Sequence, residues 1–67
     1  MQVTLKAARV NIGLSQVEAA KKLGISKDSL GNYERGKTYP NSIIIKRMEE
    51  LYQISYSNII FLPNKSA

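Results

Sequence analysis

The sequence contains no cysteine and no histidine among its 67 residues. It therefore has no disulfide, no catalytic thiol and none of the usual zinc ligands. The few carboxylates are scattered and have no imidazole partner, so an enzyme is the least favoured class. No apolar run approaches the ~20 residues of a membrane helix, and the N-terminus lacks a signal-peptide core. We expect a cytoplasmic protein with no catalytic residue, metal, cofactor, small-molecule ligand or membrane partner.

Acidic residues are scarce, with five Asp and Glu against ten Lys and Arg, which gives a net charge of +5. Residues 1–40 hold seven of the basic residues and three of the acidic ones, so most of the positive charge lies there. A basic domain favours a polyanionic partner, chiefly nucleic acid or an anionic membrane surface. A merely solvated basic surface is the alternative that counting leaves open.

The length of 67 residues corresponds to one domain, close to the smallest size that folds without metals or disulfides. We assign residues 1–67 to a single all-α unit with a helical core over 4–62 and a short tail over 63–67. No strand pattern competes with the helical periodicity.

Two helix starts with a glycine between them lie in residues 15–36. Ser15 and Glu18 form an S-x-x-E capping box for one helix, which Gly24 ends. Ser26 is placed to cap a second helix that runs to Gly36. Two helices joined by so short a turn are typical of a helix-turn-helix, whose second helix enters a DNA groove. A structural αα-hairpin is the less favoured alternative.

Three more helices complete the prediction. Thr4 caps the first, which runs to about Asn11 and ends at Gly13. Its apolar residues at helical spacing are Leu5, Ala8 and Ile12. Asn41 or Ser42 caps the fourth, whose inner face holds Ile44, Ile45, Met48, Leu51 and Tyr52. Ser55 or Ser57 starts a short fifth helix that contains Ile59, Ile60 and Phe61 and stops at Pro63.

Residues 5–61 resemble the phage repressor and Cro-type (Xre-like) helix-turn-helix family. The matching residues are Gly13-Leu14-Ser15-Gln16, Ala20, Gly24-Ile25-Ser26, Leu30, Tyr33-Glu34-Arg35-Gly36-Lys37 and Pro40. The resemblance implies a five-helix, lambda-repressor-like DNA-binding domain that dimerises on operator DNA and regulates transcription. Gly31 departs from a good helix sequence, because glycine costs about 1 kcal/mol relative to alanine. It either allows a close approach to DNA or is a tolerated exposed position.

Base readout is predicted for four polar residues on the outward side of the third helix, namely Lys27, Asp28, Ser29 and Asn32. Lys27 can donate to guanine O6 and N7, Asn32 can pair with adenine N6 and N7, and Asp28 can accept from a cytosine amino group. Asp28 is equally explained by stabilisation of the helix dipole. Ser29 can bond a base or a phosphate.

Phosphate contacts are predicted for residues at the edges of the motif, namely Gln16, Ser26, Arg35, Lys37, Thr38 and Tyr39. Gln16 lies in the first turn of its helix, where free amides and the helix dipole hold an anion. The loop after the third helix runs beside the sugar-phosphate chain, so its contacts carry affinity rather than sequence information.

The resemblance also implies an ion pair and a dimer. In similar repressors an arginine of the first helix pairs with a glutamate after the recognition residues, and Arg9 and Glu34 occupy these positions. Relatives dimerise through C-terminal residues, and the apolar candidates here are Tyr56, Ile59, Phe61 and Leu62. Some of these side chains must close the core, and we expect the remainder to support a weak homodimer.

The predicted function is a sequence-specific regulator that binds double-stranded operator DNA. The short chain leaves no room for a second domain, which favours a Cro-like repressor of a phage genetic switch. A restriction-modification controller and an antitoxin with the same fold remain open alternatives. A modulator or anti-repressor that acts through protein contacts is the alternative from a different class.

Overall fold

The structure is a computed structural model that describes residues 2–61. Within these residues the chain forms a strand β1 (Val3–Thr4) and four helices: α1 (Leu5–Asn11), α2 (Gln16–Leu23), α3 (Lys27–Arg35) and α4 (Ser42–Tyr52). A 3₁₀ turn, η1 (Tyr56–Asn58), and a strand β2 (Ile59–Ile60) follow. The predicted tail over 63–67 lies outside the described residues.

Local capping explains where the helices start. The Ser15 hydroxyl accepts from the Glu18 amide while the Glu18 carboxylate accepts from the Ser15 amide, so the predicted capping box is confirmed. Thr4 and Ser26 cap α1 and α3 through their side-chain oxygens. For α4 the cap is Asn41, whose Oδ1 accepts from the Ile44 amide at 2.9 Å. Each cap satisfies an amide that the first turn would leave without a partner.

The predicted fifth helix is reduced to the 3₁₀ turn η1 after Ser55, and the prediction that no strand forms is wrong. Ile59 and Ile60 form β2, which pairs in parallel with β1 in the register Val3↔Ile59 and Thr4↔Ile60. Successive strand residues face opposite sides, and Ile59 is 6% exposed whereas Ile60 is 41% exposed. Ile59 and Ile60 are β-branched residues, which favour strands, and Val3–Thr4 supplies the backbone partner for their pairing.

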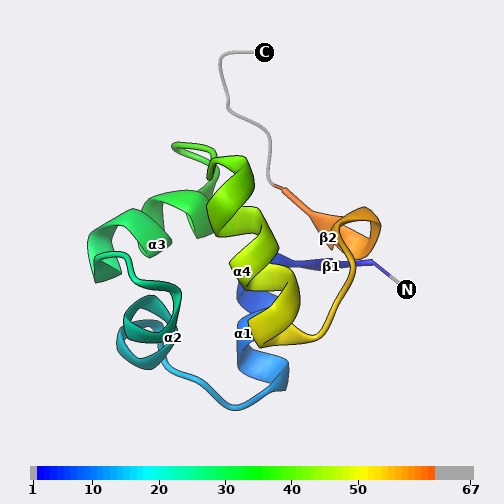
Figure 1. Ribbon diagram of the computed structural model, residues 1–67, viewed down its shortest axis with the longest axis horizontal. Coiled ribbons are helices and arrows are strands. Elements are labelled where there is room, and N and C mark those ends of the chain that lie inside the picture. Colours follow the sequence, from blue (N-terminus) through cyan, green and yellow to red (C-terminus); the bar gives the residue numbers. More distant parts are fainter. Residues whose placement is uncertain (1, 62–67) are drawn as a thin grey trace.

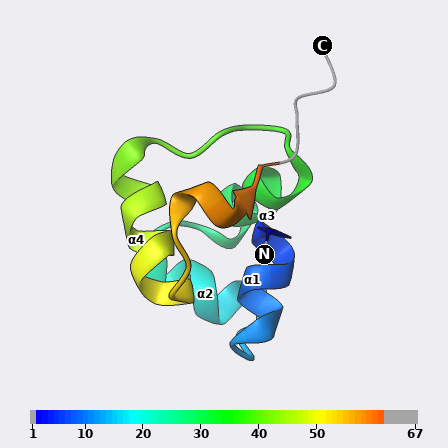
Figure 2. The same ribbon diagram turned by 90° about the vertical axis from the view of Figure 1, so that its right-hand side faces the viewer.

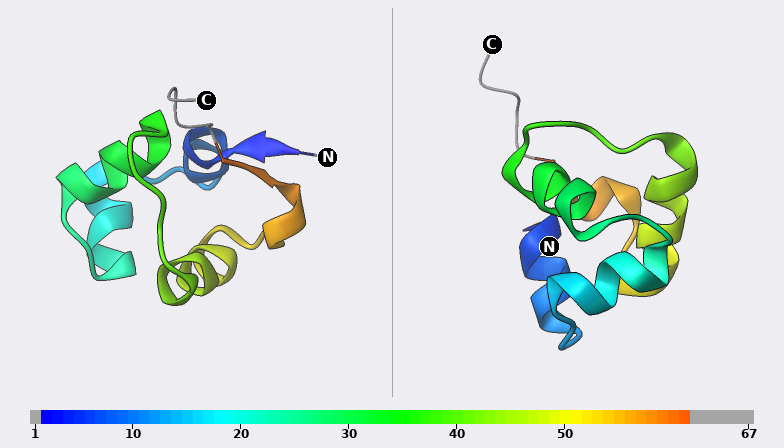
Figure 3. Two further views of the ribbon diagram at one scale, coloured as in Figure 1. Left: turned by 90° about the horizontal axis from the view of Figure 1, so that it is seen from above. Right: turned by 90° about the vertical axis from the view of Figure 1, so that its left-hand side faces the viewer.

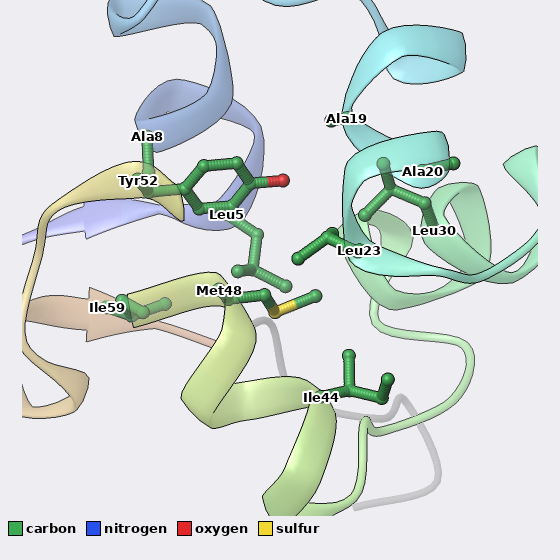
Figure 4. Close-up of a cluster of buried hydrophobic side chains, with 10 residues drawn as sticks. All are labelled: Leu5, Ala8, Ala19, Ala20, Leu23, Leu30, Ile44, Met48, Tyr52 and Ile59. Carbon is green, nitrogen blue, oxygen red and sulfur yellow. The ribbon is translucent and has the colours of Figure 1, made fainter. Parts of the chain in front are cut away.

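The hydrophobic core lies between the four helices and β2 (Figure 4). The buried apolar residues are Leu5, Ala8, Ala19, Ala20, Leu23, Leu30, Ile44, Met48, Tyr52 and Ile59. The helix ends at Asn11 as predicted, and Ile12, although it continues the spacing of Leu5 and Ala8, lies just after α1 and is 39% exposed. Gly13 then turns the chain with a φ of 77°, a conformation that glycine adopts without strain.

The elements divide between two ends of the molecule (Figure 1). α2 and α3 lie side by side at one end, and the β1–β2 pair lies at the other, with α1 and α4 between them (Figures 1 and 3). The loop between α3 and α4 runs across the top of the molecule in the view of Figure 2 and joins the end of α3 to the start of α4. In the part of the chain that the structure describes, no helix has the length and apolar character needed to cross a membrane.

Candidate nucleic-acid interface

The turn between α2 and α3 holds the two helices of the candidate interface at a fixed crossing. Gly24 ends α2 in the left-handed conformation with a φ of 76°. Nη1 of Arg47, on α4, donates to the Leu23 carbonyl at 3.0 Å and so satisfies an oxygen that the helix end would leave free. Helix α4 thereby anchors the turn that orients α3.

Helix α3 directs one side to the core and the other away from it. Leu30 is completely buried, whereas Lys27 and Asp28 are exposed. Ser29 is half-buried, and its amide and hydroxyl both contact the Ser26 hydroxyl at 3.0 Å. The serines therefore have a local capping role, and Lys27 and Asp28 are free to meet a ligand.

Asn32 and Arg35 form a pair on the outward side of α3. Nη2 of Arg35 donates to Oδ1 of Asn32 at 2.7 Å. The Arg35 guanidinium also lies over Gly31: a Cβ at that position would stand 3.1 Å from Nη1 of Arg35 and 3.7 Å from Nε2 of Gln16. Gly31 is therefore buried beneath two polar side chains, and of its two open interpretations, that of a tolerated exposed position is wrong.

Behind this face, Arg9 and Glu34 form a buried ion pair. Nε of Arg9 donates to one Glu34 oxygen at 2.7 Å and Nη2 donates to the other at 3.1 Å. The hydrogen bond to Glu34 raises the pKa of Arg9 above its ordinary value. Nη1 of Arg9 donates to the Leu14 carbonyl, and Nε2 of Gln16 donates to Glu34 at 3.1 Å. The network joins α1, the start of α2 and the end of α3.

The loop after α3 contains three of the residues predicted to contact phosphate, and their side chains have different surroundings. Lys37 and Thr38 are exposed. The Tyr39 hydroxyl instead lies 2.9 Å from that of Tyr56, an interaction that raises the pKa of Tyr39. Both rings pack against Phe61, with centroid distances of 4.9 Å from Tyr39 and 5.5 Å from Tyr56. Tyr39, Tyr56 and Phe61 form a cluster that we call the aromatic cluster.

The residues predicted for a dimer interface separate in the structure. Tyr56 is exposed and Phe61 half-buried in the aromatic cluster. The assignment of Ile59 to this surface is wrong, because pairing of β2 with β1 turns its side chain into the core. Ile60 takes the exposed position. Leu62 lies outside the described residues.

The sequence analysis did not predict three features of this region. They are the Arg47 contact with the turn, the position of the Arg35 guanidinium over Gly31, and the Tyr39–Tyr56 contact. The first and third join residues far apart in the chain, for which the sequence holds no local signal. The second has a readable signal, because residues four apart are neighbours on a helix surface. Gly31 and Arg35 have this spacing.

The turn, the crossed helices and the outward face of α3 define a helix-turn-helix DNA-binding domain. The helix-turn-helix family matches residues 5–59 of the chain. The HTH-type transcriptional regulator ImmR of Bacillus subtilis (strain 168) is 41% identical over 51 residues, which cover 76% of this chain and 40% of ImmR. The chain thus spans less than half the length of that relative. It belongs to the phage repressor and Cro-type (Xre-like) helix-turn-helix family of DNA-binding transcriptional regulators.

Proposed function

We propose that this protein binds double-stranded operator DNA sequence-specifically, as a Cro-like repressor of a phage genetic switch. The observation that carries the proposal is the outward face of α3, where Lys27, Asp28, Asn32 and Arg35 are not part of the hydrophobic core. A recognition helix needs such a row of donors and acceptors to read base edges. The net charge of +5 supports attraction to the phosphate backbone.

The roles divide by position. Lys27, Asp28 and Asn32 lie on the outward side of α3, and we assign them to recognition of the bases in the major groove. Lys37 and Thr38 follow α3 in an exposed loop, and we assign them to phosphate contacts. Gln16 begins α2 beside this face and is assigned to the backbone, with its amide fixed by Glu34.

The proposal includes a weak homodimer, because one small domain reads too few base pairs for a unique site and paired half-sites double the readout. The aromatic cluster supplies its candidate surface. Two of its three rings are exposed, and Ile60 extends the apolar surface on β2.

Selection of bound DNA from a random pool tests the function. We expect an enriched motif with two-fold symmetry and an affinity that falls steeply as salt rises. Lys37→Ala should weaken every sequence alike and lower the salt slope by about 1, leaving the motif unchanged. An absence of DNA binding at low salt would contradict the proposal and favour a modulator that contacts another protein.

A further inference from the structure

The Arg35 guanidinium occupies the place where a side chain of residue 31 would lie. Its Nη1 and Cζ stand 3.1 Å and 3.8 Å from the Cβ position of Gly31. On a helix, a long side chain covers the surface one turn toward the N-terminus from its own Cα. Arg35 is the last residue of α3, but its charge is therefore displaced toward the middle of the helix.

A second contact fixes the guanidinium in this position. Oδ1 of Asn32 accepts from Nη2 of Arg35 at 2.7 Å, so the guanidinium is held from one side while Gly31 leaves space beneath it. Nε2 of Gln16 borders the same space and is itself held by Glu34. The arginine is positioned before any ligand arrives, which lowers the entropy lost on binding.

We propose that Arg35 is a base-reading residue with a preference for guanine, and that Gly31 and Asn32 are its positioning residues. The inference rests on the proposed DNA-binding function. The guanidinium fork matches guanine O6 and N7, the most frequent specific contact in the major groove. Asn32 uses its acceptor on Arg35, so its first role is to hold the arginine rather than to read adenine.

Selected DNA pools distinguish this role from a phosphate contact. Arg35→Lys keeps the charge but loses the fork. We expect it to lose about tenfold in the preference for guanine at one position of each half-site. Gly31→Leu fills the space that the Arg35 guanidinium occupies and should remove the guanine preference at that same DNA position. Added to Arg35→Lys, it should cause no further loss of that preference. Uniform weakening of all sequences by Arg35→Lys, or an unchanged motif in Gly31→Leu, would overturn the proposal.

Asn32→Asp separates positioning from direct readout. Aspartate keeps an acceptor for Arg35 but cannot donate to adenine N7. We expect Asn32→Asp to keep the guanine preference, although its added charge weakens all sequences, whereas Asn32→Ala loses that preference. Loss of the preference in both variants would contradict the positioning role.

The position of the Arg35 guanidinium over Gly31 can also be tested without DNA. This test separates a failure of this inference from a failure of the proposed function. In the free protein, the side-chain N–H resonances of Arg35 should shift in Asn32→Ala and Gly31→Leu but stay unchanged in Lys37→Ala. Unfolding midpoints recorded for each variant show that the fold is kept. If the Arg35 resonances do not shift in either variant, the guanidinium is not held by Gly31 and Asn32, and the inference is overturned whatever the DNA results.

Discussion

Glu34 receives donors from two directions at one buried site. Arg9 donates to both of its oxygens, and Gln16 donates to the one that Nη2 of Arg9 also contacts. Charges removed from water are stable only when such partners surround them. The same Nε2 atom of Gln16 lies 3.7 Å from the Cβ position of Gly31, so it stands between the buried ion pair and the outward side of α3.

Glu34→Ala should lower the free energy of unfolding by about 3–5 kcal/mol, because it leaves the buried Arg9 guanidinium without its partner. Denaturant unfolding measures the effect. Glu50→Ala removes an exposed glutamate and is the matched control, expected to stay within about 0.5 kcal/mol of the wild type. The additional replacement of Arg9 by Met should recover part of the loss. An unchanged midpoint in Glu34→Ala would contradict the contribution of the pair.

The Tyr52 hydroxyl is buried and has no hydrogen-bond partner among the described residues. Burial raises the pKa of Tyr52 to about 12, from an ordinary value of 10.0, and the negative charge of Glu34 adds to the shift. An unsatisfied buried hydroxyl is unfavourable, so Tyr52→Phe should raise the free energy of unfolding by about 1 kcal/mol.

The same substitution has a signature at high pH. Between about pH 10 and pH 12, Tyr52 ionises in the unfolded chain but stays neutral in the folded one. Ionisation then favours unfolding, so wild-type stability falls as the pH rises through this interval. Tyr52→Phe lacks this contribution, and its stability should fall less. Denaturant unfolding at pH 9 and at about pH 11 compares the two proteins. An equal loss of stability in both would contradict the assignment of this pH dependence to Tyr52.

At the scale of the elements, helix starts were predictable because each signal lies within a few residues. Ser15, Ser26 and Asn41 bond to amides three residues later in the chain. The end of the chain was different. Ile59 and Ile60 carry no helical cap, and their strand depends on Val3 and Thr4 at the opposite end of the sequence. A pairing between such distant residues leaves no local pattern to read.

The turn of the helix-turn-helix depends on one residue of α4. Arg47→Ala removes the donor to the Leu23 carbonyl and should lower the free energy of unfolding by about 1 kcal/mol. Lys46→Ala, at the exposed neighbouring position, is the matched control and should have little effect. Thermal or denaturant unfolding measures both variants. Equal stability of the two would show that the contact contributes nothing to the fold.

For the whole molecule, the sequence predicted which helix presents the candidate site but not how its side chains combine. Helical periodicity was sufficient to direct Lys27, Asp28 and Asn32 away from the core. It did not predict that Arg35 folds back over Gly31, because an extended arginine fits the same pattern. Nor did it predict the contacts of the Tyr39 side chain with Tyr56 and Phe61, which lie beyond α4 in the sequence.

The proposed homodimer is testable at this scale. Tyr56→Ser removes a ring and a hydroxyl contact from the aromatic cluster, so it should shift the monomer–dimer equilibrium toward monomer in sedimentation experiments. Val10→Ser alters another exposed apolar residue, on α1, and is the matched control. A wild type that sediments as a monomer with and without selected DNA would refute the dimer. A Tyr56→Ser dimer as strong as the wild type would exclude this surface.

The parallel pairing of β1 with β2 has a consequence for the order of folding. Almost the whole described chain lies between Val3 and Ile59, whereas the contacts of α2 with α3 and of α2 with α4 join segments closer together in the sequence. Closing a long loop costs more chain entropy than forming contacts between near neighbours, and nonlocal pairings slow folding. We therefore expect the helices to reach their native contacts first, and the strand pair to join the two ends of the described chain afterwards.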